Sequence, residues 1–369
     1  MAPIAIQELN LDTKSYPSDL SETPSPDGPL LAVPPSLKSS STVSTTWLKL
    51  NSAAPIHVQV GGLPATYEDE PFSGAKKLRH ILENTDELVV CPGVYDGLSA
   101  RTAMELDFKA LYMTGAGTTA SRLGQPDLAI AQLADMRDNA DMIANLDPFG
   151  PPLIADMDTG YGGPIMVART VEHYIRSGVA GAHLEDQILT KRCGHLSGKK
   201  VVPREEYIQR IRAAVGAKRR LKSDFVLIAR TDALQSLGYD ECIARLKEAR
   251  EAGADVGLLE GFKSHEQAAQ AVQELKPWPL LLNSVENGHS PLITVDQARE
   301  MGFRIIIFSF ATLAPAYTAI RETLLRLKNE GVTGTPEGIT PVKLFEVCGL
   351  KDAMEVDKGA GGGAFKEGV

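Results

Sequence analysis

The segment from Lys191 to Pro203, KRCGHLSGKKVVP, combines the residue types of a proton-transfer site. Cys193 stands between two cationic side chains, Arg192 and His195, and Gly194 lets backbone N–H groups come close to a ligand. Positive neighbours stabilise a thiolate and lower the pKa of a cysteine, so the sequence predicts that Cys193 exchanges a proton near neutral pH. A solvated basic loop with an unreactive cysteine is the alternative explanation.

Carboxylates follow several apolar runs elsewhere in the chain. Asp156 and Asp158 stand two residues apart in one run, and on a strand this spacing would place both on the same face, within reach of one ion. Hard oxygen ligands of this kind suit Mg²⁺ or Mn²⁺ better than zinc. Helix capping by an aspartate after a strand is the alternative for this pair.

Arg230 ends another apolar run and has the geometry for a bidentate grip on a carboxylate. A structural ion pair with Asp232 or Glu260 would explain the same arginine. The string TGAG, residues 114–117, offers backbone N–H donors to an anionic oxygen, although a tight turn is the more common explanation. His183, just upstream of Glu185, is expected in the core or behind the site.

Eight short apolar runs alternate with helical patterns and so predict a (β/α)8 barrel of the TIM type. The predicted strands are 88–95, 110–117, 152–160, 182–187, 226–233, 256–262, 280–288 and 304–310. An open doubly wound sheet is the runner-up, but no GxGxxG follows the first strand. A further helix at 341–348 and a glycine-rich tail are expected after the eighth unit.

A barrel gathers the C-terminal ends of its strands at one mouth, where reacting groups belong. Nearly every predicted strand ends in polar or acidic residues: Tyr95 and Asp96, Thr114 to Gly117, Asp156 and Asp158, Glu185 and Asp186, Arg230 and Asp232, Glu260, and Asn283 with Glu286. So many carboxylates would repel one another unless a cation offset their charge. The pattern therefore predicts a metal-dependent active site at this mouth.

Composition limits the partners and the compartment. The 369 residues include 47 acidic and 38 basic side chains, a net charge of −9, which argues against a nucleic-acid or anionic-membrane partner. Four widely spaced cysteines (Cys91, Cys193, Cys242 and Cys348) indicate neither a disulfide scaffold nor a structural zinc site. Apart from Cys193 we expect them to be small buried side chains. With no secretory signal or membrane span evident, we expect a cytoplasmic protein.

Residues 1–72 differ from the rest of the chain. They are rich in Ser, Thr and Pro, show no sustained period, and are predicted to be a largely disordered tail, although Trp47, Leu48 and Leu50 could dock on the body. Residues 73–369 are predicted to form the catalytic barrel with a C-terminal helical extension.

Several of these strings together identify a family. IADMDTGYGGP at 154–164, HLEDQ, KRCGH and ARTDA resemble the isocitrate lyase/phosphoenolpyruvate mutase superfamily over roughly residue 74 to the C-terminus. CPGVYDGLSAR, YMTGAGTTASRLG and LLNSVENGHSP further resemble its fungal oxaloacetate acetylhydrolase branch. Relatives of that branch include 2,3-dimethylmalate lyase and methylisocitrate lyase.

The resemblance implies a barrel whose last helix is swapped between subunits of a homotetramer, built as a dimer of dimers. It implies a Mn²⁺ or Mg²⁺ ion on Asp156, Asp158 and Glu185, partly through water. Catalytic roles fall on Cys193, as the proton-transferring group, and on Ser290, Arg230 and His195, the last on a mobile loop with Gly194. The implied contacts to a small dicarboxylate substrate are Tyr112, Thr114, Gly115, Ala116, Gly194, Arg230, Glu260, Asn283 and Ser290.

The expected reaction is metal-dependent hydrolysis of oxaloacetate to oxalate and acetate. Ser290 matches the serine of oxaloacetate hydrolases, but Ser284 lies nearby and stays open as an alternative. The stretch FSFATLAPAY lacks the arginine that methylisocitrate lyases carry for a third carboxylate, which favours a dicarboxylate. Rival functions are a C–C lyase acting on a 2-hydroxy dicarboxylate such as 2,3-dimethylmalate, a phosphonomutase, and a catalytically inactive scaffold.

Overall fold

Eight parallel strands close into a barrel in this computed structural model, which describes residues 73–147 and 149–366. The strands pair in chain order, and β8 closes the barrel by pairing with β1 from Val89↔Ile305 to Pro92↔Phe308. Their bounds are β1 (Val89–Val94), β2 (Leu111–Met113), β3 (Leu153–Asp156), β4 (Gly181–Glu185), β5 (Val226–Thr231), β6 (Val256–Leu259), β7 (Leu280–Asn283) and β8 (Ile305–Phe308). The predicted TIM-type barrel is confirmed.

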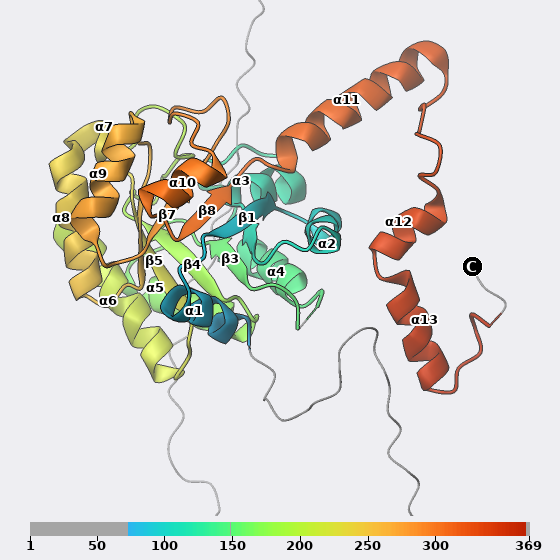
Figure 1. The fold of residues 1–369 in the computed structure, drawn as a ribbon, viewed down its shortest axis with the longest axis horizontal. Helices are drawn as coiled ribbons and strands as arrows, with labels where there is room; N and C mark the ends of the chain where they lie inside the picture. Colours follow the sequence, from blue (N-terminus) through green and yellow to red (C-terminus); the bar gives the residue numbers. More distant parts are fainter. Residues whose placement is uncertain (1–72, 148, 367–369) are drawn as a thin grey trace, which may run out of the picture. The chain divides into compact units, whose positions relative to one another are not determined.

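Helices up to α10 surround the strands on the outside, and three more helices follow β8 (Figure 1). They are α1 (Gly74–Asn84), α2 (Gly97–Glu105), α3 (Gly115–Thr118), the π-helical turn η1 (Thr119–Leu123), α4 (Leu133–Ala144), α5 (Pro164–Arg176), α6 (Arg204–Arg220), α7 (Leu234–Leu237), α8 (Tyr239–Glu251), α9 (His265–Leu275), α10 (Val295–Met301), α11 (Leu313–Glu330), α12 (Pro341–Val347) and α13 (Leu350–Gly359). Side-chain caps begin several of them: the Asp96 carboxylate accepts from Ser99 N ahead of α2, and the Thr294 hydroxyl accepts from Gln297 N ahead of α10.

Two apolar clusters hold the barrel together. The larger lies between strands and helices, and the smaller fills the barrel interior with side chains such as Cys91, Ile228 and Ile307. Leu78 of α1 belongs to the interior cluster, together with residues at the beginnings of strands such as Val89. Helix α1 therefore covers the N-terminal end of the barrel, so the C-terminal mouth is the end available for a site.

The C-terminal region departs from the prediction. Three helices follow β8: α11 completes the eighth unit, α12 matches the helix expected at 341–348, and α13 was not expected. None of the three contains a buried residue. Cys348 is exposed, so its predicted burial is wrong, while Cys91 and Cys242 are buried as expected. Helix α12 contacts the barrel through an ion pair between Lys343 and Glu105 at 2.9 Å.

Two further expectations concern the N-terminal tail and membrane-spanning helices. The predicted disordered tail, residues 1–72, and the suggested docking of Trp47, Leu48 and Leu50 lie outside the described residues. None of the described helices has the length and apolar character that a membrane span requires.

Candidate active site

The three predicted metal ligands lie at the ends of β3 and β4, but not as the spacing suggested. Asp156 ends β3, and Asp158 stands beyond the strand with a φ of +48° and donates its N–H to Asp156 Oδ1 at 2.8 Å. The prediction that both carboxylates project from one face of a strand is therefore wrong, because the chain turns between them. Glu185 ends β4 and is fully buried.

The donor atoms fit a divalent cation even though they do not converge on one point. Across residues 73–147 and 149–366, no group of three or more His, Cys, Asp and Glu side chains is close enough to hold a metal ion. Asp158 Oδ1 and Glu185 Oε2 are nonetheless buried and accept no hydrogen bond beyond their ion pairs with Lys191 and Arg230. Burial raises the pKa of Asp158 to about 7 and that of Glu185 well above its usual range. A hard cation would offset this incompletely balanced negative charge.

The segment carrying the predicted catalytic cysteine, residues 188–200, is here called the Cys193 loop. Its ends are joined by a bridge between Gln187 and Val201, and Gln187 Nε2 donates to Arg192 O at 2.9 Å. Asp127, in the segment between η1 and α4, accepts from Cys193 N at 3.1 Å and from Lys191 Nζ at 2.6 Å. The same Lys191 ammonium is paired with Asp158. Asp127 and Lys191 are thus held within the site, which the sequence did not predict.

Cys193 is a protonated thiol, contrary to the prediction from its cationic neighbours. Burial, assisted by the negative charge of Asp127, raises the pKa of the Cys193 thiol to about 11. Arg192, its sequence neighbour, directs its Nη1 to Ser197 O at 3.0 Å. The basic neighbours in the sequence therefore do not predict the pKa of Cys193, because burial and the charge of Asp127, which is distant in the sequence, raise it by more than the neighbours lower it. A thiol of this kind serves as a proton donor and not as a nucleophile.

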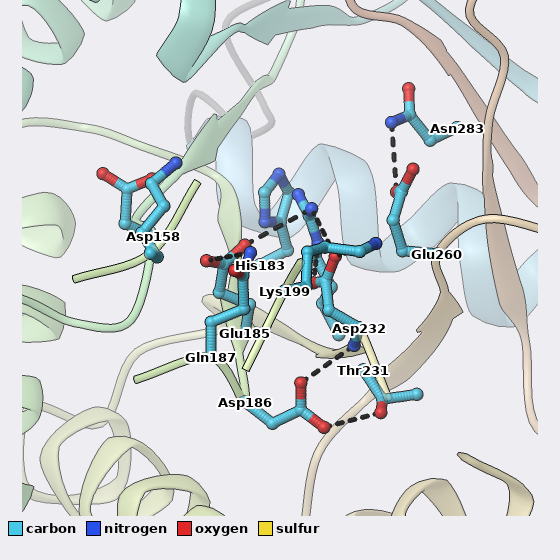
Figure 2. Close-up of polar contacts among 12 residues, drawn as sticks. Asp158, His183, Glu185, Asp186, Gln187, Lys199, Thr231, Asp232, Glu260 and Asn283 are labelled. Atoms are coloured by element: carbon cyan, nitrogen blue, oxygen red, sulfur yellow. Dashed lines mark hydrogen bonds and ion pairs between the residues drawn. The ribbon is translucent and has the colours of Figure 1, made fainter. Parts of the chain in front are cut away.

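The tip of the Cys193 loop lies against the ends of β5 and β6. A Cβ atom at Gly194 would stand 2.6 Å from Arg230 Nη2 and 3.0 Å from Glu260 Cγ, so only glycine fits this contact. His195 Nε2 lies 3.4 Å from Glu260 Oε1. Asn283 Nδ2 donates to Glu260 Oε2 at 3.1 Å (Figure 2). Thus Gly194, His195, Arg230, Glu260 and Asn283 are brought together, and burial lowers the pKa of His195 so that its ring is neutral.

Arg230 on β5 is held by Asp232, the residue that directly follows the strand. Its Nε and Nη2 donate to the two carboxylate oxygens of Asp232 at 2.8 and 3.1 Å, and Nη2 lies 3.3 Å from Glu185 Oε2. The structural ion pair considered as an alternative is therefore present. Among the described residues no hydrogen bond involves Arg230 Nη1, which leaves this donor for a ligand.

The β2 end contributes a short helix in place of a turn. Thr114 caps α3, with its hydroxyl accepting from Gly117 N at 3.4 Å. A Cβ atom at Gly115 would lie 2.4 Å from Asp156 Oδ2, so the glycine lets α3 approach that carboxylate. Ala116 is half-buried beside it. Gly115 thus borders Asp156, with Thr114 and Ala116 on either side of it in the chain.

Tyr112 lies behind the acids, next to His183. Its side chain belongs to the barrel interior and its hydroxyl lies 2.8 Å from His183 Nε2. His183 is fully buried, as predicted, and its Nδ1 lies 3.6 Å from Asp156 Oδ1. Burial lowers the pKa of His183 to about 4, so the ring is neutral. It packs beside Asp156 without forming a charged pair with it.

The two candidate serines occupy different environments. The buried Ser284 hydroxyl donates to Ile293 O at 3.3 Å. Ser290 is half-buried, and in the described part of the chain its hydroxyl has no hydrogen-bond partner. Asn283, which precedes Ser284, accepts from Ser309 Oγ at 2.7 Å, a contact that sequence analysis missed.

One cavity adjoins the acids. It measures about 130 Å³ and is lined by Ala129, Ala131, Gln132, Asp158, Thr159, Tyr161, Leu189 and Lys191. Cys193, Arg230 and Ser290 are not among its walls. This cavity therefore borders Asp158 of the predicted metal side and none of these three predicted catalytic residues.

Known proteins share this chain's sequence and fold. The family model described as phosphoenolpyruvate phosphomutase matches residues 78–328. A curated relative, 2,3-dimethylmalate lyase of Eubacterium barkeri, is 37% identical over 285 residues, which is 77% of this chain and 96% of the relative.

Solved structures extend the comparison. A structure of oxaloacetate acetylhydrolase with the inhibitor 3,3-difluorooxalacetate is 86% identical, has a TM-score of 0.80, and is matched over 80% of this chain and 100% of that chain. A phosphonopyruvate hydrolase complex with oxalate and Mg²⁺ is 26% identical, with a TM-score of 0.67 over 78% of this chain and 99% of that chain. The chain belongs to the phosphoenolpyruvate phosphomutase family, within the isocitrate lyase/phosphoenolpyruvate mutase superfamily that its motifs indicated.

Proposed function

We propose that the protein hydrolyses the C2–C3 bond of oxaloacetate to give oxalate and acetate. The observation that carries this proposal is the 86% identity, over 80% of the chain, to an oxaloacetate acetylhydrolase whose structure contains an oxaloacetate analogue. The site geometry supports C–C cleavage of a small dicarboxylate, but by itself it would also suit a lyase. The sequence identity therefore decides between the two.

Arg230 and Asn283 would hold the substrate anion. The tip of the Cys193 loop packs on Arg230 Nη2, so a carboxylate bound by the neighbouring free Nη1 would lie close to the loop that carries Cys193. Arginine suits this role because its planar donors match a carboxylate. Gly194 permits the close approach, and His195 beside Glu260 offers a neutral ring that can hydrogen-bond without adding charge.

Asp156, Asp158 and Glu185 would hold the Mn²⁺ or Mg²⁺ ion, partly through water, since buried oxygens of Asp158 and Glu185 accept no hydrogen bond beyond their ion pairs with Lys191 and Arg230. Such an ion, when bound, supplies positive charge that stabilises negative charge developing on substrate oxygens. Thr114, Gly115 and Ala116 would border the same ligand from the β2 side. The main-chain approach of α3 to Asp156 supports this placement.

Hydrated oxaloacetate is a gem-diol, and the Ser290 hydroxyl is available to bond one of its oxygens. Transfer of a diol proton to a site carboxylate or to water lets the C2–C3 bond break, so that C2 becomes the second carboxylate of oxalate and the bonding electron pair remains on C3. The Cys193 thiol then gives its proton to C3 and completes acetate. The raised pKa of Cys193, about 11, keeps the proton on sulfur until a strongly basic carbon is formed.

The experiment that tests this function measures oxalate release from oxaloacetate by the purified protein with Mn²⁺. We expect turnover by the wild type, a loss of about 10²-fold in kcat for Ser290→Ala, because it removes one hydrogen bond to the reacting diol, and a small effect of Ser284→Ala, whose hydroxyl is engaged with Ile293. Wild-type protein that releases no oxalate would disprove the proposal. A strong effect of Ser284→Ala alone would move the diol contact to Ser284.

A C–C lyase acting on 2,3-dimethylmalate or a similar 2-hydroxy dicarboxylate is the second candidate. The 37% identity to a 2,3-dimethylmalate lyase over 96% of that relative favours it specifically. Such a reaction would use the same acids and the same cysteine but begin from an alcohol. Turnover of dimethylmalate in place of oxaloacetate by the same preparation would establish it.

We also propose a homotetramer in the cytoplasm. Helices α11–α13 leave Tyr317, Ile320, Leu324, Phe345 and Val356 largely exposed, which suggests that another subunit covers them. All four cysteines are free, as expected in a reducing compartment.

The oligomer is tested by light scattering. We expect the mass of a tetramer for the wild type and a smaller particle for the double variant Ile320→Glu, Leu324→Glu, because charges on the α11 face oppose burial. A monomeric wild type would contradict the proposal.

A further inference from the structure

A buried ion pair ties the exit of the Cys193 loop to the end of β5. Lys199 Nζ lies 2.8 Å from Asp232 Oδ1, and both side chains are almost wholly inaccessible, at 6% and 0% exposure (Figure 2). The same carboxylate accepts two hydrogen bonds from Arg230. One aspartate thus binds both the loop and the arginine proposed to hold the substrate.

Asp232 is itself fixed by the core. Its N–H donates to Asp186 Oδ1 at 2.8 Å, and Asp186 Oδ2 accepts from Thr231 Oγ1 at 2.6 Å and from Arg245 Nη1 at 3.1 Å. Asp186 directly follows β4, Thr231 lies on β5 and Arg245 on α8, so none of the three belongs to the loop. The Lys199 ammonium therefore pairs with a carboxylate whose position does not depend on the loop.

A second contact from the same segment holds the main chain of the loop. Gln235 Oε1 accepts from Gly198 N at 3.0 Å and from Lys199 N at 3.3 Å. Gly198 has a φ of +77°, which glycine adopts without strain, so the chain turns here to bring Lys199 inward. Six residues, 230–235, thus supply the arginine and both contacts to the loop exit.

The tip of the loop meets the same arginine from the other side, because Gly194 packs on Arg230 Nη2. Cys193, next to Gly194, is held by its N–H bond to Asp127 O. A shift at the loop exit would be transmitted over the few residues between Lys199 and Gly194. It would change both the thiol position and the packing on Arg230.

We propose that Lys199 is a positioning residue, whose pairing with Asp232 holds the Cys193 thiol over the substrate anion bound by Arg230. This rests on the proposed function, which gives Cys193 and Arg230 their roles. Neighbouring Lys200 provides a matched control, since its side chain is exposed. The two adjacent lysines therefore differ in burial and not in chemistry.

The kinetic test compares four variants for oxalate release. We expect Lys199→Met to lower kcat about 10²-fold, the effect of a small misplacement of a reacting group, with little change in KM because Asp232 still holds Arg230. Asp232→Asn should lower kcat and also raise KM, since the arginine loses its ionic partner. Lys199→Arg should restore most of kcat, and Lys200→Met should match the wild type.

A second measurement follows the loop without relying on catalysis. Thermolysin cleaves before exposed Leu196, a bond that none of these substitutions alters, and mass spectrometry identifies the cut. We expect Lys199→Met and Gln235→Ala to be cut faster than wild type and Lys200→Met, at a temperature where thermal unfolding shows all four proteins to be folded. Wild-type cleavage or wild-type kcat in Lys199→Met overturns the proposal. If the wild type does not cleave oxaloacetate, the proposed function fails and the thermolysin rates alone decide whether the ion pair holds the loop.

Discussion

Replacing Cys193 with alanine is expected to lower kcat for oxalate release by about 10²–10⁴-fold, the range for losing a positioned general acid. KM should change little, because Cys193 carries no charge that would bind the substrate anion. Steady-state kinetics of Cys193→Ala, with Cys348→Ala as the control at an exposed cysteine, measure the effect. A Cys193→Ala enzyme within a few-fold of the wild type would remove the thiol from the mechanism.

The pH dependence of alkylation provides an independent check on this thiol. A group whose pKa is raised to about 11 loses its proton only as the pH approaches that value, and only the thiolate reacts with iodoacetamide. The modification rate of Cys193 should therefore still rise with pH between 9 and 10, whereas an unperturbed cysteine, with a pKa of about 8.5, levels off. A rate that is already constant at pH 9 would contradict the raised pKa.

Arg230→Lys is expected to lower kcat/KM by about 10²–10³-fold, or roughly 3–4 kcal/mol at about 1.4 kcal/mol per factor of ten. Lysine keeps the positive charge beside Asp232 and Glu185, so the buried acids stay paired, but it lacks the planar set of donors that binds two carboxylates at once. The loss should fall on KM and kcat together, and inhibition by oxalate should weaken in parallel.

Arg212→Lys, on the exposed face of α6, is the matched control and should behave as wild type. Thermal unfolding would show whether Arg230→Lys remains folded. An Arg230→Lys enzyme with wild-type affinity for oxalate would mean that the guanidinium serves the Asp232 ion pair alone and does not contact the substrate.

The barrel was predictable because parallel strands covered on both faces are continuous apolar runs. The run 304–310 contains β8 at Ile305–Phe308, and 226–233 contains β5 at Val226–Thr231. The expected strands were too long at their C-terminal ends. There the polar residues belong to loops or short helices, as Thr114 does at the beginning of α3.

The sequence predicted which residues form the site better than it predicted their protonation and burial. Arg230, Glu260 and Asn283 come together because strand ends meet at one mouth. The protonation of Cys193 was not predictable, since Asp127 lies far away in the sequence and burial is a property of the folded loop. Lys199 and Lys200 are likewise identical residues next to each other in the sequence. Lys199 is the buried one because its ammonium pairs with Asp232 in the folded protein.

The raised pKa of Cys193 also bears on how the protein withstands oxidants. Peroxides attack the thiolate, and a pKa of about 11 leaves about one thiolate for every 10⁴ thiols at pH 7. The same proton that suits Cys193 to protonate carbon thus shields its sulfur from conversion to a sulfenic acid. A loop that buried this cysteine less would expose the sulfur to oxidation as well as weaken it as an acid.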